Sequence, residues 1–252
     1  MPIDYARRLT SPDRTKRANR HLGWALAFIA GAINAGAFLA VHQYTSHMTG
    51  MVSSMADYFV LGDIGLAAAA FGGVFSFLIG AATTAVLVNY ARRRHLRSQF
   101  SMPLLLEATL LLVFGVIGGR LAEIQGLFVP ATVMLLCFIM GLQNALVSKI
   151  SNSEIRTTHV TGLITDVGIE LGKLFYWNRV QTDLKLKVMA DRDRLVLLTF
   201  LVLAFFAGGV VGAIGFQKMG YAMTVPLAVF LAALAVVPAA DDVRASRRKT
   251  DF

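Results

Sequence analysis

The chain has 252 residues, of which 56% are hydrophobic and only 15% are charged. A soluble domain carries about 25% charged residues, so this composition excludes a water-soluble enzyme and a disordered scaffold. The net charge of +9 would suit a nucleic-acid partner, but the basic residues flank apolar stretches, which is the positive-inside pattern of membrane proteins. The single cysteine, Cys137, lies in an apolar run and can form no intramolecular disulfide.

The chain begins with a polar, basic arm at residues 1–21, which we interpret as a cytoplasmic arm before a signal-anchor helix rather than as a secretory signal. A helix needs about 20 apolar residues to cross a membrane. Six stretches have this length, namely 22–42, 64–90, 103–122, 128–148, 195–216 and 220–239. Two shorter stretches, 48–62 and 159–175, carry polar groups. The sequence therefore predicts an all-α, polytopic membrane helix bundle with about six full transmembrane helices and two short broken or re-entrant helices.

The basic residues decide between six and eight crossings. Of the 24 lysines and arginines, all but Arg120 and Lys218 lie in five segments beside the apolar stretches. If all eight stretches crossed, residues 92–97 would lie opposite the N-terminal arm. If the two short stretches do not cross, all five basic segments are cytoplasmic. We therefore expect cytoplasmic N- and C-termini, with a basic tail at 241–252.

Three motifs recur in the same order in the two halves, which indicates a duplication. They are GAINA (31–35) and GLQNA (141–145), TSHMTG (45–50) and TTHVTG (157–162), and FGGVFSFLIGA (from Phe71) and FFAGGVVGAIG (from Phe205). We divide the chain into membrane repeat 1 at 22–125 and membrane repeat 2 at 126–240, with a cytoplasmic insertion at about 176–194. Because each half holds three crossings, the second copy enters from the opposite side, which predicts an inverted repeat.

Small residues recur every four positions in two predicted spans. These stripes are Gly72, Ser76, Gly80 and Thr84, and Ala204, Gly208 and Gly212. Such stripes let neighbouring helix backbones approach closely in lipid, so we expect helix packing along them. Residues 178–194 alternate charged and apolar side chains, which favours an interfacial or cytoplasmic helix.

The repeated His-x-Thr-Gly motif stands directly before each short apolar run. Its residues are His47, Thr49 and Gly50 in the first half and His159, Thr161 and Gly162 in the second. The threonines could cap the helices, and the glycines could let a ligand approach the backbone. Two helix N-termini from opposite halves would favour an anionic or carboxylate-bearing solute, whereas plain helix capping is the alternative.

The two motif histidines are candidates for proton carriers or for hydrogen-bond donors to a substrate. The alternative is that each is an interfacial, structural histidine. A metal site needs further ligands at suitable spacing, and none cluster beside the histidines in the sequence. We therefore expect neither a metal nor a cofactor.

Acidic residues within apolar stretches are costly and need a partner, a proton or water. We interpret Asp57 and Asp166 as candidates for proton or cation coupling. For Glu170 we expect instead a pairing with Lys173 or Arg179 near the cytoplasmic boundary.

Three further polar residues lie within long apolar spans. Glu107 follows Pro103 by about one turn of helix, so we expect it at the membrane boundary. Asn34 and Asn144 occupy equivalent places in the two halves. Asparagine in a membrane helix usually forms hydrogen bonds across helices, and this pair could line the same substrate cavity as the short helices.

The segments GAINAGAFL…TSHMTG and GLQNALVSK…RTTHVTGLITDVGIELG resemble the YoaK-like family of bacterial integral membrane proteins, formerly a domain of unknown function. The resemblance covers most of residues 20–240. The family's first motif usually continues Met-Thr-Gly-Asn, but here Met51 replaces the asparagine. The resemblance implies a multi-pass protein of the bacterial cytoplasmic membrane and suggests transport, without a substrate.

These features together predict a secondary transporter of a small, anionic solute that works by alternating access with proton coupling. Its partners would be the lipid bilayer, the solute and protons, and not nucleic acid. The alternatives are a channel or passive pore, and a membrane assembly or interaction protein without transport activity. We expect no enzyme, because the sequence shows no recognisable nucleophile–base pair.

Overall fold

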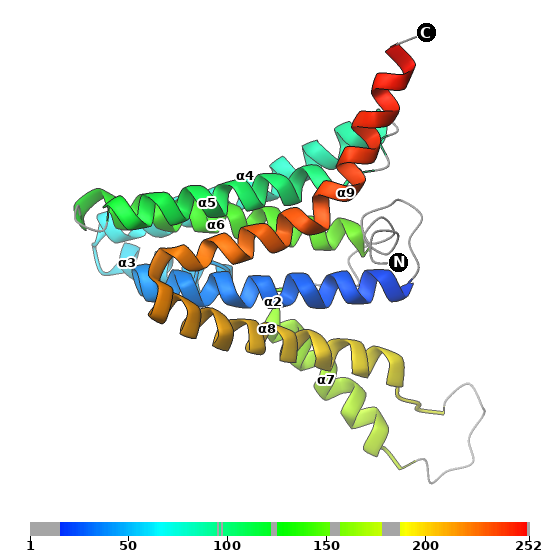
Figure 1. Cartoon of the computed structure of the whole chain (residues 1–252). Coiled ribbons are helices and arrows are strands. Elements are labelled where there is room, and N and C mark those ends of the chain that lie inside the picture. Colours follow the sequence, from blue (N-terminus) through cyan, green and yellow to red (C-terminus); the bar gives the residue numbers. More distant parts are fainter. Residues whose placement is uncertain are drawn as a thin grey trace.

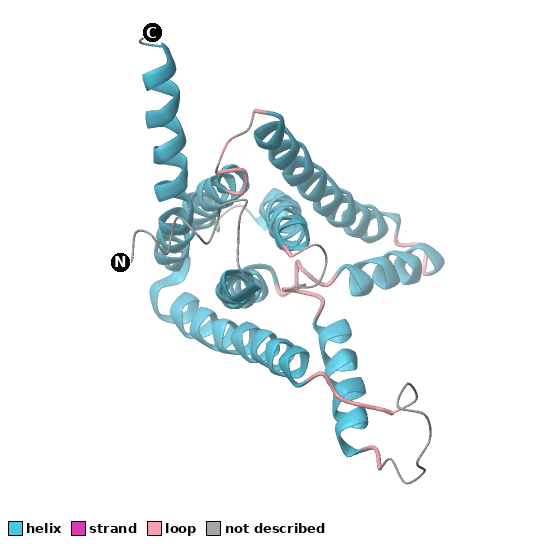
Figure 2. Ribbon diagram, turned by 90° about the vertical axis from the view of Figure 1, so that its right-hand side faces the viewer, coloured by secondary structure: helices cyan, strands magenta, loops and turns pink. Residues whose placement is uncertain are grey.

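The computed structural model of the chain describes residues 16–94, 96, 98–121, 125–151, 157–177 and 187–250. The described elements are α-helices and one 3-10 turn, with no strand among them (Figure 2). The long helices are α2 (Lys16–Val41), α4 (Ile64–Arg93), α5 (Ser101–Leu121), α6 (Gln125–Ile150), α8 (Arg192–Met219) and α9 (Thr224–Thr250). The short helices α3 (Met48–Val60) and α7 (Val160–Phe175) follow α2 and α6, and the turn η2 (Gly220–Met223) links α8 to α9.

These helices confirm the predicted fold class, a polytopic helical membrane bundle. Five stretches are long and apolar enough to cross a membrane, and the fifth, Arg192–Val236, contains both α8 and the first half of α9. At 1.5 Å per residue, α3 with 13 residues and α7 with 16 residues are about 20 and 24 Å long. The hydrocarbon core is about 30 Å thick, so the short helices cannot cross it alone.

The first long helix of each half packs against the third helix of the other half. Where α2 crosses α8, a Cβ on Gly208 would collide with the backbone oxygen of Phe28. A Cβ on Gly31 would likewise collide with the backbone oxygen of Phe205. Only glycine at these two positions lets the backbones come so close.

The crossing of α4 and α6 repeats these contacts position by position. Gly80 of α4 lies against the backbone oxygen of Phe138, and Gly141 of α6 lies against that of Phe77. Phe28 and Gly31 of α2 lie 110 positions before Phe138 and Gly141 of α6. Phe77 and Gly80 of α4 lie 128 positions before Phe205 and Gly208 of α8. The two crossings thus make the same contacts at equivalent positions.

The predicted small-residue stripes supply both crossings. One turn beyond Gly80, the Thr84 hydroxyl donates a hydrogen bond of 2.9 Å to the backbone oxygen of Leu142. At the equivalent place in the other crossing, Gly212 packs against the backbone of Ala32. The expectation of helix packing along these stripes is therefore confirmed.

The contacts also fix the directions of the helices. Phe28 meets Gly208 and Gly36 meets Phe216, so the paired positions advance together and α2 runs parallel to α8. The pairs between α4 and α6 advance together in the same way. Figure 1 shows that α4 and α6 run opposite to α2 and α8. Every long helix of the first half therefore runs opposite to its counterpart in the second.

The last long helices of the halves, α5 and α9, begin alike and pack antiparallel. Residues 101–104 read Ser-Met-Pro-Leu and residues 224–227 read Thr-Val-Pro-Leu, and proline early in a helix costs no backbone hydrogen bond. A Cβ on Gly115 would collide with the Thr224 side chain, and one on Gly118 with the Tyr221 ring. The three motifs of the sequence did not reveal this fourth resemblance between the halves.

The third helices of the halves begin with equivalent caps. Asp63 Oδ1 accepts a hydrogen bond of 3.0 Å from the Leu66 amide, and Asp191 Oδ1 accepts one of 3.0 Å from the Arg194 amide. Residues 187–191 are not helical and residues 192–194 form the start of α8. The helix predicted at 178–194 is therefore wrong at 187–191, because the aspartate cap starts α8 only at residue 192. Residues 178–186 lie outside the described residues.

Basic residues gather at the end of the bundle where α2 begins, which we call the basic end (Figure 1). They lie in the first turns of α2 and α8 and in the last turns of α4 and α6. Arg120 and Lys218 stand at the opposite end, in the last turns of α5 and α8. This distribution follows the charge pattern from which the six-crossing arrangement was predicted.

We expect Gly208→Ala and Gly80→Ala each to lower the free energy of unfolding by about 1–3 kcal/mol, because the added methyl group forces a crossing apart. The measurement is the unfolding of the purified protein in detergent. Gly119→Ala is the matched control, since a Cβ there meets nothing within 4 Å. Equal stability of all three variants would show that the crossings are looser than described.

Candidate functional site

The two short helices begin at the two copies of the His-x-Thr-Gly motif. His47 is the N-cap of α3 with φ −92° and ψ 71°, and His159 is the N-cap of α7 with φ −85° and ψ 57°. Neither helix start has a side-chain cap hydrogen bond, so the first backbone N–H groups lack a helical partner. The prediction that Thr49 or Thr161 caps the helix is wrong, because each threonine already lies in the first turn.

The motif glycines make room for the motif histidines. A Cβ on Gly50 would lie 2.6 Å from Nδ1 of His47, and a Cβ on Gly162 would collide with Nδ1 of His159. In both copies the imidazole therefore folds over the first turn of its own short helix. The ring is held beside the unpartnered backbone N–H groups, where it can contact whatever these groups bind.

Asparagine side chains fasten each motif to the preceding long helix. Asn34 Oδ1 accepts a hydrogen bond of 3.0 Å from the Ser46 hydroxyl, and Asn144 Oδ1 accepts one of 2.7 Å from the Thr158 hydroxyl. Asn34 lies seven residues before the end of α2, or about 10 Å along the helix axis. The chain thus turns back after each long helix, and the short helix begins beside that helix rather than beyond its end.

The six motif positions have the same exposure in both copies. Starting from Thr45 and from Thr157, the order in both is buried, half-buried, exposed, half-buried, exposed, half-buried. The exposed positions are the histidine and the threonine of each His-x-Thr-Gly motif. Thr45 and Thr157 are 0% exposed, and neither hydroxyl oxygen has a partner among the described residues. Neither threonine is among the predicted site residues, although they are the first residues of the repeated motifs TSHMTG and TTHVTG.

The two motifs do not form one contiguous site. α3 packs against α4 and α7 packs against α8, and no hydrogen bond joins the motifs among the described residues. The Gln143 side chain donates a hydrogen bond of 3.2 Å to the Leu26 carbonyl, which sets α2 and α6 side by side. Asn34 lies eight residues beyond Leu26, so the two asparagines are about 12 Å apart along the helix axes.

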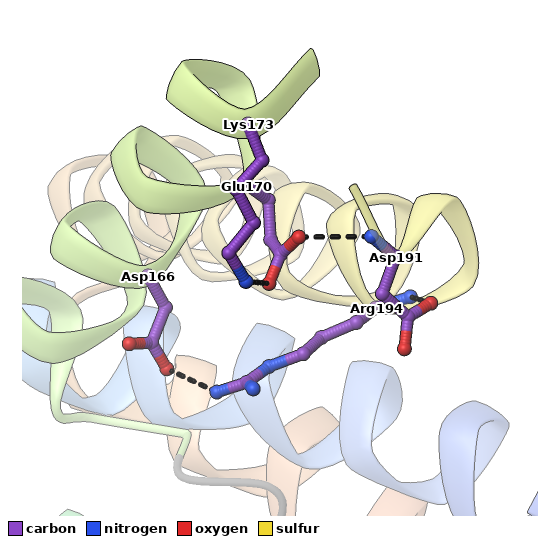
Figure 3. Close-up of polar contacts among 5 residues, drawn as sticks. All are labelled: Asp166, Glu170, Lys173, Asp191 and Arg194. Atoms are coloured by element: carbon purple, nitrogen blue, oxygen red, sulfur yellow. Dashed lines mark hydrogen bonds and ion pairs between the residues drawn. The ribbon is translucent and has the colours of Figure 1, made fainter. Parts of the chain in front are cut away.

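The second short helix carries ion pairs at the basic end (Figure 3). Lys173 Nζ lies 2.9 Å from Glu170 Oε1, which confirms one of the two pairings expected for Glu170. The Asp191 amide donates a hydrogen bond of 2.9 Å to Glu170 Oε2. These hydrogen bonds, that of Lys173 first, hold the pKa of the Glu170 carboxyl below its ordinary value. Glu170 therefore ties α7 to the start of α8.

The two predicted coupling residues differ in their surroundings. Asp166 Oδ2 lies 3.0 Å from a guanidinium nitrogen of Arg194, and both side chains are about half exposed. Asp57 is exposed on α3 and forms no ion pair with a described residue. Asp166 thus has a counter-charge, whereas Asp57 has none among the described residues.

Glu107 lies on the packed face of α5. Its side chain is 0% exposed, and neither carboxyl oxygen has a hydrogen-bond partner among the described residues. The distance from Pro103 along the chain indicates a depth in the membrane, but it does not show which face of the helix is packed. The boundary position of Glu107 stays a prediction, and its complete burial was not predicted.

The long apolar helices and the two short ones define a multi-pass helical membrane protein. Residues 22–237 match a family described as a protein of unknown function, DUF1275, and the chain belongs to this family. This match agrees with the resemblance found in the sequence motifs. Comparisons with curated proteins and with solved structures give no match.

The hydrogen bonds of Asn34 and Asn144 can be measured by two double-mutant cycles, Asn34→Ala with Ser46→Ala and Asn144→Ala with Thr158→Val. We expect each cycle to give a coupling energy of about 0.6–1.7 kcal/mol, the range for side-chain hydrogen bonds in membrane proteins. Unfolding in detergent is the readout. Additive effects of the paired substitutions would contradict the contacts that fasten the short helices.

Proposed function

We propose that this protein is a secondary transporter of a small solute that bears an anionic group. The observation that carries the proposal is the pair of short helices, each of which begins beside a long helix at an unpartnered, histidine-bearing N-terminus. Short or broken helices that start within the membrane are a common way for transporters to present backbone N–H groups to a substrate.

The arrangement of the halves supports an inverted repeat. Equivalent helices run in opposite directions, and the contacts of one crossing recur in the other. Inverted repeats suit alternating access, because two similar halves can exchange conformations and so open one side or the other. The charge distribution favours placing the basic end in the cytoplasm, and the family resemblance favours the bacterial inner membrane.

The chemistry at each helix start favours an anionic group. Three backbone N–H groups at the start of α3 precede the first helical hydrogen bond, which runs from the Met51 amide to the His47 carbonyl at 3.1 Å. The same bond recurs in α7 from Leu163 to His159 at 3.1 Å. Such groups and the helix dipole attract negative charge. The exposed imidazole adds a hydrogen-bond donor, and the solute would meet one start from each side of the membrane.

The two halves differ in the contacts that their short helices make at the membrane boundary. In the transport cycle, such a contact would therefore exist on one side of the membrane only. In the second half, the ion pair of Asp166 with Arg194 and the hydrogen bond from the Asp191 amide to Glu170 hold α7 against the start of α8 at the basic end. In the first half, Asp57 has no such partner on α4. We therefore assign Asp166 to this boundary contact and retain Asp57, which is exposed on α3, as the coupling candidate.

The test is counterflow into proteoliposomes with radiolabelled acetate, lactate, succinate and inorganic phosphate, and with glycerol as a neutral probe. We expect one anion to accumulate transiently against internal unlabelled anion, and glycerol not to move. The combined His47→Ala and His159→Ala variant should lose about fivefold or more in rate, because the solute loses a hydrogen bond of about 1 kcal/mol at the motif that it meets on each side of the membrane. His42→Asn is the matched control, since His42 lies outside the motif at φ 52° and asparagine tolerates this conformation.

The other possible outcomes of the counterflow experiment would each contradict part of the proposal. Rapid equilibration of a probe without counterflow would indicate a channel or passive pore. Counterflow that the histidine variant leaves unchanged would refute the proposed site while keeping transport. No movement of any of the four anions would contradict the proposed substrate class and favour an assembly or interaction role.

A further inference from the structure

Glu107 is an ionisable side chain enclosed by the apolar core of the bundle. It lies six residues after the start of α5, and its side chain is 0% exposed. Neither of its oxygens accepts a hydrogen bond from a described residue. On the same helix, Leu104, Ala108 and Leu111 are buried members of the main hydrophobic core. Glu107 therefore points into packed hydrocarbon rather than toward water or a counter-charge.

The elements packed against α5 offer Glu107 no described counter-charge. They are α9, α6, η2 and α4. Their described titratable or charged side chains are Tyr90, Arg92 and Arg93 of α4, Cys137 and Lys149 of α6, and Tyr221 of η2, with none at 224–236 of α9. The described ion pairs include none with Glu107, so the cationic groups at the helix ends do not reach it.

The free-energy cost of burying a charge decides whether this carboxyl is ionised. An unpaired carboxylate in an apolar interior is penalised by many kcal/mol, and such a group takes up a proton rather than remain charged. A protonated carboxyl without a partner costs much less, because only one neutral polar group is then left unsatisfied. We propose that Glu107 is a proton-binding site, occupied by a proton in this conformation and emptied when movement of the helices admits water.

Glu107 has no acidic counterpart in the second half. The matching starts of α5 and α9 align it with Phe230, which is 43% exposed, so the two positions differ in residue type and in burial. A buried ionisable group without a counter-charge among the described residues is best explained by a function that uses its charge change. Glu107 differs in this from Asp166, which pairs with Arg194.

A role of Glu107 in proton coupling deepens the proposed transport function and rests on it. Proton binding by Glu107 does not depend on that function. In a coupled cycle, the carboxyl would lose its proton on the side where water reaches it and regain one on the other side. The proton moves from the carboxyl oxygen to water and back, so no further reactant is needed. The neutral form suits the closed core described here.

The test is infrared spectroscopy of the purified full-length protein in lipid vesicles at neutral pH, without any solute. We expect the carbonyl stretch of a protonated carboxylic acid, which shifts in deuterium oxide and disappears in Glu107→Gln. Glutamine keeps the shape and the neutral charge, so this variant should fold. Asp193→Asn is the matched control and should leave the band unchanged, because the Asp193 side chain is 87% exposed and lies outside the proposed site. A band absent from the wild type, or equal in wild type and Glu107→Gln, would overturn the proposal.

A second measurement needs no variant. Dicyclohexylcarbodiimide is an apolar reagent that modifies protonated carboxyls within membranes, so we expect mass spectrometry to find the adduct on Glu107 and less of it at alkaline pH. An unmodified Glu107 would count against the proton site. A clear infrared band together with no movement of the probe anions would leave the proton site standing and refute its coupling to transport.

Discussion

The close approach of parallel helices at two glycine-lined crossings is the constraint on which the rest of the structure depends. Gly31 and Gly208 bring α2 and α8 together, and Gly80 and Gly141 do the same for α4 and α6. Water does not drive helices together inside a membrane, so contact between backbones must hold them. Each crossing joins the first helix of one half to the third helix of the other, which makes the halves interdependent and positions the short helices at their edges.

Polar groups also occur in pairs at equivalent positions of the two halves. Asn34 and Asn144 hold the turns before α3 and α7, while Thr45 and Thr157 are buried without partners among the described residues. Unsatisfied buried polar groups are rare in folded proteins and call for a reason. Because the two threonines recur at equivalent positions, we expect them to share one function. Glu107 occurs only in the first half, so we expect a different function for it.

Much of this architecture can be read from the sequence, because its signals are local. Apolar run length gives the helices, and the small-residue stripes give the packed faces, as Gly80 and Gly208 show. Contacts between distant segments leave no such signal. The ion pair of Asp166 with Arg194 spans 28 residues, and the burial of Glu107 depends on which face of α5 is packed. The exchange of partners between the halves likewise follows only from the three-dimensional arrangement.

The most direct test of the account is the sidedness of two equivalent positions, Leu61 after α3 and Met189 before α8, which are 128 residues apart and both exposed. Single cysteines are introduced at each in a Cys137→Ser background, with Arg94 and Ala222 as a second equivalent pair, and intact cells are treated with an impermeant maleimide. We expect labelling at 61 and 222 and protection at 189 and 94. Equal labelling within either pair would mean that the halves are parallel, and the opposed halves on which the transport mechanism rests would be refuted.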